Sequence, residues 1–214
     1  MTQPLHIDIV SDVVCPWCAV GYNQLRVALE RLGLDAEIHW QPFQLNPDMG
    51  QEGQNLGEHL RQKYGVTPAQ SKQNRDHITR LGAEVGFRFN FTDDMRMFNT
   101  HDAHQLIHWA ALSGRDTEVK QAFQKAYFAD GLDISNREVL VGIVADLGFD
   151  ADEARAILSE QRYDREVRED MAFWQQQGVN SVPAVIIDRK YLVPGAVGVE
   201  QFSQILSEMT RQKG

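Results

Sequence analysis

The sequence predicts a mixed α/β fold that is interrupted by a long helical block. Three observations lead to this prediction: a strand–helix–strand pattern over residues 5–43, helical periodicity between residues 46 and 177, and renewed strand patterns after Gly178. A strand, a helix and another strand within about 40 residues form a βαβ unit with parallel strands and a right-handed crossover. We therefore expect a mixed sheet covered by helices, with the helical block as an insertion.

The opening βαβ unit has clear helix-end signals. Residues 5–14 alternate apolar and polar side chains and then become wholly apolar, which is typical of a strand. Pro16 cannot continue a strand ladder but suits the first position of a helix, and Gly33 suits the helix end. The second strand is expected over residues 36–43, where apolar side chains return in alternation.

The helical block shows its own start signals. Thr67 followed by Pro68 predicts a capped helix start, and Ser135 with Glu138 has the spacing of a capping box. Apolar stripes at helical spacing follow each signal, while strand patterns are absent from this part of the sequence. We therefore expect residues 46–159 to form an all-helical inserted domain.

The strand patterns that return after the block predict an antiparallel hairpin. Residues 184–187 and 191–193 are joined by a three-residue turn, and an amphipathic helix follows from Val199. Without the insertion, the order of elements is βαβαββα, which is the thioredoxin layout. We expect residues 1–45 and 178–214, with a helix over 160–177, to form this thioredoxin-like domain.

Composition excludes several functional classes. The chain has 214 residues and a net charge of −9, which disfavours binding to nucleic acid or to an anionic membrane surface. The first 14 residues lack the pattern of a signal peptide, and apolar runs fall well short of the ~20 residues that cross a bilayer. We expect a cytoplasmic protein, in a compartment where thiols are usually kept reduced.

The two cysteines fall in one motif, Cys15-Pro16-Trp17-Cys18. Their number argues against a disulfide-rich scaffold and against a four-cysteine zinc site. The motif lies where the first strand meets a helix, and a helix N-terminus stabilises the thiolate that acts as the nucleophile. We therefore predict that Cys15 attacks a substrate and that Cys18, one helical turn later, resolves the mixed disulfide.

The sequence resembles the DsbA-like branch of the thioredoxin superfamily. Within that branch it is similar to the FrnE-like group, which is related to 2-hydroxychromene-2-carboxylate isomerases and kappa-class glutathione transferases. The resemblance rests on four segments: residues 11–21, residues 40–47, the Asn99-Thr100 and Ala103-His104 pairs with Leu106, and residues 178–184.

The resemblance implies further site residues. In this family the proline of the Val-Pro step is cis and lies beside the thiols, which implies that role for Pro183. Val182, with Ser181 before it, would then offer its backbone to an extended substrate. Between the cysteines, Trp17 is a candidate substrate contact, and Pro16 and Trp17 together are expected to tune the redox potential.

Two departures bear on glutathione. Isomerase and transferase relatives typically carry serine where this chain has Cys15, so the two retained thiols favour dithiol–disulfide chemistry. The loop of residues 195–198 is Gly-Ala-Val-Gly and lacks polar side chains that could hold glutathione. We expect no cofactor beyond the redox-active Cys15–Cys18 pair, and glutathione stays open as a co-substrate. The expected partners are thiol or disulfide proteins or small molecules, and an apolar helical cap is also compatible with a homodimer.

Two weaker signals involve acids and histidines. Asp8 either lies beneath the thiols and exchanges a proton with Cys18, tuning the pair, or is an exposed acid on an alternating strand, and we favour the second. His101, His104 and His108 share one helical face, where they could bind a metal, line the cleft or face water. We favour an exposed polar face and expect no metal site.

We therefore predict a thiol–disulfide oxidoreductase and keep two alternatives. One is a glutathione-dependent isomerase or transferase that acts on an aromatic small molecule and needs no resolving thiol. The other is a peptide-binding or chaperone module in which the thiols are incidental. Cysteine-to-serine variants separate the three.

Overall fold

The computed structural model describes residues 4–213 and contains a four-stranded mixed sheet. In spatial order, its strands are β2 (Ala36–Pro42), β1 (Leu5–Ser11), β5 (Ala184–Ile187) and β6 (Tyr191–Pro194). β1 and β2 are parallel, whereas β5 pairs antiparallel with both β1 and β6. This confirms the predicted α/β class and the thioredoxin-like order of strands.

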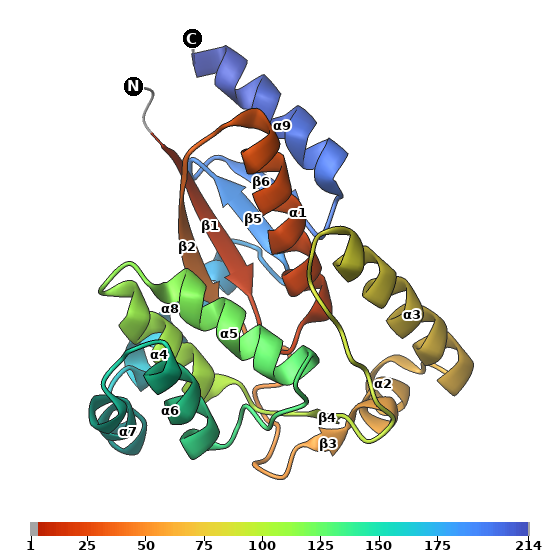
Figure 1. Cartoon of the computed structure of the whole chain (residues 1–214), viewed down its shortest axis with the longest axis vertical. Helices are drawn as coiled ribbons and strands as arrows, with labels where there is room; N and C mark the ends of the chain where they lie inside the picture. The colour runs from red at the N-terminus through yellow and green to blue at the C-terminus, as the bar shows by residue number, and fades with distance from the viewer. Residues whose placement is uncertain (1–3, 214) are drawn as a thin grey trace.

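Helices cover both faces of the sheet. α1 (Pro16–Leu32) packs against α9 (Val199–Lys213), and Figure 1 shows the two side by side on one face. Ile7 and Ile9 of β1 point to this face and join the main hydrophobic core. Val10 points to the other face, where Trp174 of α8 (Asp164–Gln176) packs in a smaller apolar cluster.

The helical block lies at the carboxyl ends of β1 and β2 (Figure 1). Its helices are α2 (Leu56–Tyr64), α3 (Pro68–Glu84), α4 (His101–Ala111), α5 (Asp116–Phe128), α6 (Arg137–Asp146) and α7 (Ala151–Glu160). The block also contains a small antiparallel sheet of β3 (Gln54–Asn55) and β4 (Arg96–Met97). Two-residue strands are too short to show periodicity, so the sequence predicted an all-helical block.

The helix ends test the capping signals. α3 begins with the predicted cap: the Thr67 hydroxyl accepts from the Gln70 amide at 3.3 Å, and Gln70 Oε1 accepts from the Thr67 amide at 2.9 Å. Gly33 ends α1 in the left-handed conformation, with φ of 61°. The prediction of a capping box at Ser135 was wrong, because Asn136 is the N-cap of α6 and its side chain accepts from two backbone amides.

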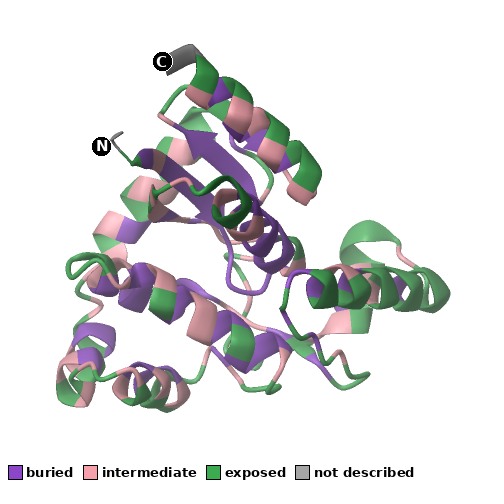
Figure 2. Cartoon of the chain, turned by 45° about the horizontal axis from the view of Figure 1, so that its top comes forward, coloured by how far each residue is buried: buried purple, intermediate pink, exposed green. Residues whose placement is uncertain are grey.

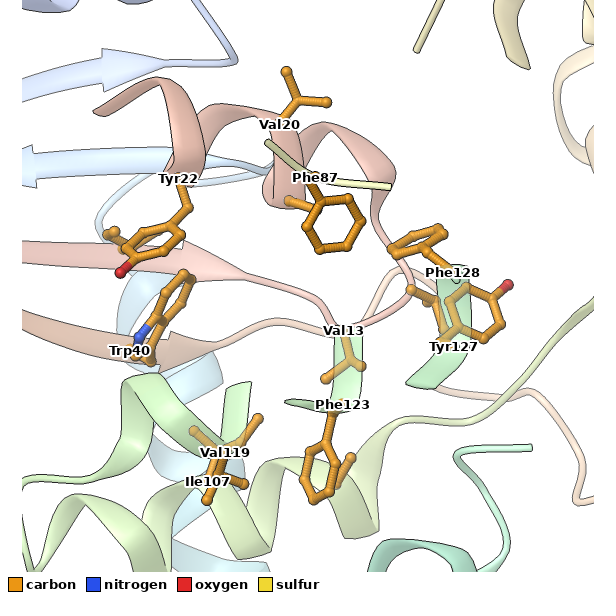
Figure 3. Packing of buried hydrophobic residues seen from close by; sticks show 14 of the residues in the cluster. Val13, Val20, Tyr22, Trp40, Phe87, Ile107, Val119, Phe123, Tyr127 and Phe128 are labelled. Carbon is orange, nitrogen blue, oxygen red and sulfur yellow. The ribbon is translucent and has the colours of Figure 1, made fainter. Parts of the chain in front are cut away.

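One hydrophobic core joins the sheet to the helical block. Buried residues line the inner sides of β1, α1 and α5 (Figure 2). An aromatic group lies between α1 and α5, where the Phe87 and Phe128 ring centroids are 6.3 Å apart (Figure 3). Val13, which follows β1, is fully buried in the same core. The end of β1 is therefore held rigidly against the block. Within residues 4–213, every helix is too short or too polar to cross a bilayer.

Candidate active site

Cys15 lies at the N-terminus of α1. β1 ends at Ser11, three residues earlier than predicted, and residues 12–14 turn the chain into the helix. Cys15 is the N-cap and Pro16 occupies the first helical turn, while the Cys15 side chain makes no capping hydrogen bond. A thiolate at this position faces the partial positive charge of the helix N-terminus, which stabilises it.

The two thiols are reduced, buried and hydrogen-bonded to each other. Cys15 is 4% exposed and Cys18 is fully buried. The hydrogen bond to Cys18, together with burial, raises the pKa of Cys15 well above its ordinary value. Burial also raises the pKa of Cys18, but the bond from Cys15 and the charge of Lys120 outweigh it, so the pKa of Cys18 is lowered overall. The two thiols therefore titrate as one coupled pair, and the charge of Lys120 favours its negative form.

A buried lysine lies behind Cys18. Lys120 of α5 is 1% exposed, and its Nζ donates to the carbonyl of Ser11 at 3.4 Å. The same Nζ lies 5.3 Å from the centre of the Trp40 ring, a favourable cation–π position. Burial lowers the pKa of Lys120 to about 8, although the negative charges of Cys18 and Asp12 favour the protonated form.

Asp12 and His104 complete this buried polar group. Asp12 Oδ2 accepts from the Leu45 amide at 2.7 Å. Burial raises the pKa of Asp12, but the hydrogen bond from His104, with smaller contributions from Leu45 and Lys120, holds it below the usual range. Burial lowers the pKa of His104, so its imidazole is neutral at pH 7. His104 Nε2 lies 3.0 Å from the Phe43 carbonyl, which only accepts, so Nε2 carries the hydrogen. Asp12 and Lys120 are thus the two charged groups beside the thiols.

A cavity of about 400 Å³ opens onto Cys15. Its volume is within the range of small-molecule sites. α2 and α3 of the helical block supply much of its wall. The start of α1, with Cys15, and Val182 supply the part of the wall at the thiol. The lining is mainly apolar and includes Leu45, Leu56, Leu60, Ile78, Phe91, Phe128 and Val182, with His59, Asn74 and Arg75 as polar members.

Of the residues implied by the family resemblance, some lie beside the Cys15 thiol and one does not. The Val182–Pro183 bond is cis, and the Val182 carbonyl lies 3.8 Å from Cys15 Sγ. Trp17 is 36% exposed and lines the cavity beside Cys15. Ser181 is exposed and lies outside the cavity lining, so the structure does not bring its side chain to the thiols.

Asp8 occupies neither of the positions that we considered. It is 6% exposed, so it is not a surface acid, and it lies on the face of β1 opposite to Ile7 and Ile9. Its carboxylate bonds to His6 at 2.9 Å and to Gln41 at 2.8 Å. Asp8 is therefore not the acid beside the thiols. That acid is Asp12, whose negative charge raises the pKa of Cys15.

The three histidines of α4 do not face water together. His101 and His104 are buried and His108 is half-buried, so the predicted exposed face was wrong. The reason is that α4 packs against four other elements: α5, α7, α8 and β2. Each ring pairs with a different acid: His101 with Asp164, His104 with Asp12 and His108 with Asp170.

Asp12 and Lys120 were not predicted as site residues. Asp12 stands within the family-like segment, three residues before Cys15, so its position alone was a signal. Lys120 shares helical spacing with Gln124 and Tyr127, which are both buried. A lysine on that face of an amphipathic helix signals a buried charge, although nothing in the sequence places it beside the thiols.

Comparison with known proteins identifies the family of the chain. The model of the DSBA-like thioredoxin domain family matches residues 6–207. A probable DsbA oxidoreductase from Streptomyces coelicolor is 32% identical, with a TM-score of 0.88, over 95% of this chain and 89% of its own.

Two more distant structures share the fold. The cytosolic disulfide reductase DsbM from Pseudomonas aeruginosa, solved with glutathione, is 19% identical with a TM-score of 0.63, over 97% of this chain and all of its own. A 2-hydroxychromene-2-carboxylate isomerase is 14% identical with a TM-score of 0.73, over 97% of each chain. The resemblance drawn from the sequence is thereby confirmed: the chain belongs to the DSBA-like thioredoxin domain family.

Proposed function

We propose that this protein is a thiol–disulfide oxidoreductase that works through Cys15 and Cys18. One observation carries the proposal: Cys15 stands at a helix N-terminus on the wall of a cavity, with a second thiol in hydrogen-bond contact behind it. A single nucleophilic cysteine would serve a transferase or isomerase equally well. The second, fully buried thiol is of use mainly for resolving a mixed disulfide.

The reaction proceeds in two exchanges. Cys15 Sγ attacks a substrate disulfide RS–SR′, so that a Cys15–SR bond forms, R′S⁻ leaves, and the Cys15 proton passes to Cys18. Cys18 then gives this proton to R′S⁻ and attacks Cys15 Sγ, so that the Cys15–Cys18 disulfide forms and RS⁻ leaves. The substrate gains two electrons and the protein dithiol loses two, and the reverse sequence oxidises a substrate dithiol.

The buried charges favour this proton movement. The two thiols share a hydrogen bond and titrate as a coupled pair, so Cys18 is the base that lies within reach of the Cys15 thiol. The positive charge of Lys120 stabilises the Cys18 thiolate before the first exchange and again before the second. Asp12 acts in the opposite sense on Cys15, because its negative charge raises the pKa of that thiol.

The cavity limits what reaches Cys15. A mainly apolar space of about 400 Å³ accommodates a small disulfide or one side chain of a larger substrate. Arg75 and Asn74 on its wall suit a carboxylate or amide group, so we include glutathione among the candidate co-substrates. We expect the protein to act in the cytoplasm, where the reduction potential of the pair decides whether it reduces or oxidises.

A redox titration with an insulin-reduction assay tests the proposal. We expect a two-electron titration of Cys15–Cys18, loss of turnover in Cys15→Ser, and a trapped mixed disulfide in Cys18→Ser. Ser159→Ala, an exposed position on α7, serves as the matched control and keeps the full rate. If no intramolecular disulfide forms at any potential, the proposal is wrong.

The same variants separate the two alternatives. A glutathione-dependent isomerase or transferase would retain turnover on an aromatic substrate in Cys18→Ser, because it needs no resolving thiol. A chaperone or peptide-binding module would retain full activity in the Cys15→Ser, Cys18→Ser double variant.

A further inference from the structure

Four residues with metal-binding side chains meet at the far end of β1 and β2 from the thiols. Because side chains alternate along a strand, His6 and Asp8 share one face of β1, and Glu37 and His39 share the same face of β2. The parallel register places His6 opposite Glu37 and Asp8 opposite His39. The proposed thiol chemistry uses none of these four residues.

Three of them are already close enough to converge on one ion. One ligand atom from each of His6, Glu37 and His39 lies within 4.8 Å of the others. The two imidazole rings are stacked, with centroids 4.4 Å apart. With zinc–ligand bonds of about 2.0–2.2 Å, tetrahedral ligand atoms are about 3.4 Å apart. Rotation of the side chains, including a turn of one imidazole out of the stack, would bring the three groups onto one ion.

Asp8 orients the first histidine. Its Oδ2 lies 2.9 Å from His6 Nε2, and Gln41 donates to its Oδ1 at 2.8 Å. In the tautomer in which His6 Nε2 donates to Asp8, and so does not accept from Arg189 Nε at 3.4 Å, the other nitrogen keeps a lone pair available to a metal. Metal-binding histidines ordinarily have this kind of carboxylate partner.

The second histidine has a nitrogen without a partner. His39 Nε2 is buried from solvent and makes no hydrogen bond to any part of the chain that the structure describes. A buried polar atom in this state costs free energy and calls for an explanation, such as an ion at the site. This observation is independent of the clustering of ligand groups.

Local charge favours a cation on balance. Glu37 and Asp8 contribute two carboxylates at the site, whereas Arg189 Nε lies 3.4 Å from His6 Nε2 and opposes a positive ion. Two imidazoles and a carboxylate suit zinc and similar transition metals, whereas magnesium prefers oxygen ligands alone.

We propose that His6, Glu37 and His39 bind one divalent ion of the zinc type, with Asp8 as the positioning residue for His6. Water completes the coordination, and the ion links β1 to the edge strand β2. The proposal departs from the expectation of no metal site, which was drawn from the two cysteines and the α4 histidines.

Zinc titration of a thiol-free protein tests the site. The Cys15→Ser, Cys18→Ser double variant, without an affinity tag, removes the competing thiolate ligands and makes the result independent of the proposed redox function. Calorimetry should show one zinc ion per chain and no comparable binding of magnesium. His6→Gln and His39→Gln should each abolish this binding, and Asp8→Asn should weaken it about tenfold or more.

A control variant and a cobalt spectrum separate binding at this site from zinc binding elsewhere and from misfolding. His108→Gln, a half-buried histidine on α4, is the matched control and should bind zinc normally. Cobalt in place of zinc should give visible absorption bands that disappear in His39→Gln, with circular dichroism showing that the variant is folded. Absence of zinc binding, or binding that persists in both His6→Gln and His39→Gln, would overturn the proposal.

Discussion

Replacing Lys120 by methionine should stabilise the fold while it weakens the thiolate of Cys18. Methionine has a similar length and fills the same buried space without a charge. Lys120 is 1% exposed and remains mostly protonated at pH 7, with a pKa lowered from 10.5 to about 8 by burial. The fold thus holds a cation that would be better solvated in the unfolded chain.

The size of the effect follows from the two pKa values of Lys120. The difference between 10.5 and about 8 corresponds to about 3 kcal/mol against the folded state at pH 7. Because the folded pKa is the lower one, the full cost applies below pH 8 and disappears as the pH rises to 10.5. The variant should therefore exceed the wild type by up to about 3 kcal/mol at pH 7, and the gap should close between pH 8 and 10.5.

Urea unfolding at several pH values measures this gap. Lys125→Met is the matched control, because Lys125 lies on the same helix but is exposed and paired with Asp130. The free energy of unfolding of Lys125→Met should differ from that of the wild type by no more than about 0.5 kcal/mol at any pH. Thiolate absorbance, followed as a function of pH, should show a higher pKa for Cys18 in Lys120→Met, and insulin reduction at pH 7 should slow.

Three outcomes would refute this reasoning. Lys120→Met could be less stable than the wild type at pH 7, which would mean that the pairing of Lys120 with Asp12 outweighs its desolvation. The stability gap could stay constant between pH 8 and 10.5, or thiol titration could be unchanged. Either result would show that Lys120 does not interact with the site in the way that its burial and contacts imply.

Three further predictions use simpler changes. Asp12→Asn removes a negative charge that raises the pKa of Cys15, so alkylation of Cys15 by iodoacetamide near pH 7 should become faster; an unchanged or slower rate would contradict the charge assignment. Gly82→Ala should destabilise the protein by about 1–3 kcal/mol, because the new methyl group would lie 2.5 Å from the Phe89 ring. Gly142→Ala should stabilise it by about 0.5–1 kcal/mol in the same thermal or urea assay, because the position is helical, exposed and open. A more stable Gly82→Ala or a less stable Gly142→Ala would show that packing is not the cause.

Much of the fold was predictable from periodicity and from helix ends. The βαβ unit, the hairpin and the Thr67 and Gly33 caps all depend on residues close together in the sequence, and the structure has each of them. The pairing of β3 with β4 joins residues about 40 positions apart through two residues on each side. No local pattern encodes such a contact.

The thiols could be found from the sequence, but their electrostatic surroundings could not. A Cys-X-X-Cys motif at a helix start is a local signal, whereas the charge behind Cys18 comes from Lys120, about 100 residues later. Asp8 was considered as the acid that exchanges a proton with Cys18, because it lies on the strand that leads to Cys15. Alternation along β1 turns its side chain away from α1, and the chain turn after β1 brings in Asp12 instead.

The helical block is part of the site rather than an addition to it. Residues 46–159 were predicted as an inserted helical domain. Within it, α2 and α3 line the cavity at Cys15, and α5 supplies the cation beside Cys18. A thioredoxin-like core alone would keep both thiols but would lose the cavity wall and the charge of Lys120. The shape of the substrate site and the ionisation of the thiols thus depend on the same insertion. A change in how the insertion packs on β1 should therefore alter substrate selection and thiol pKa together.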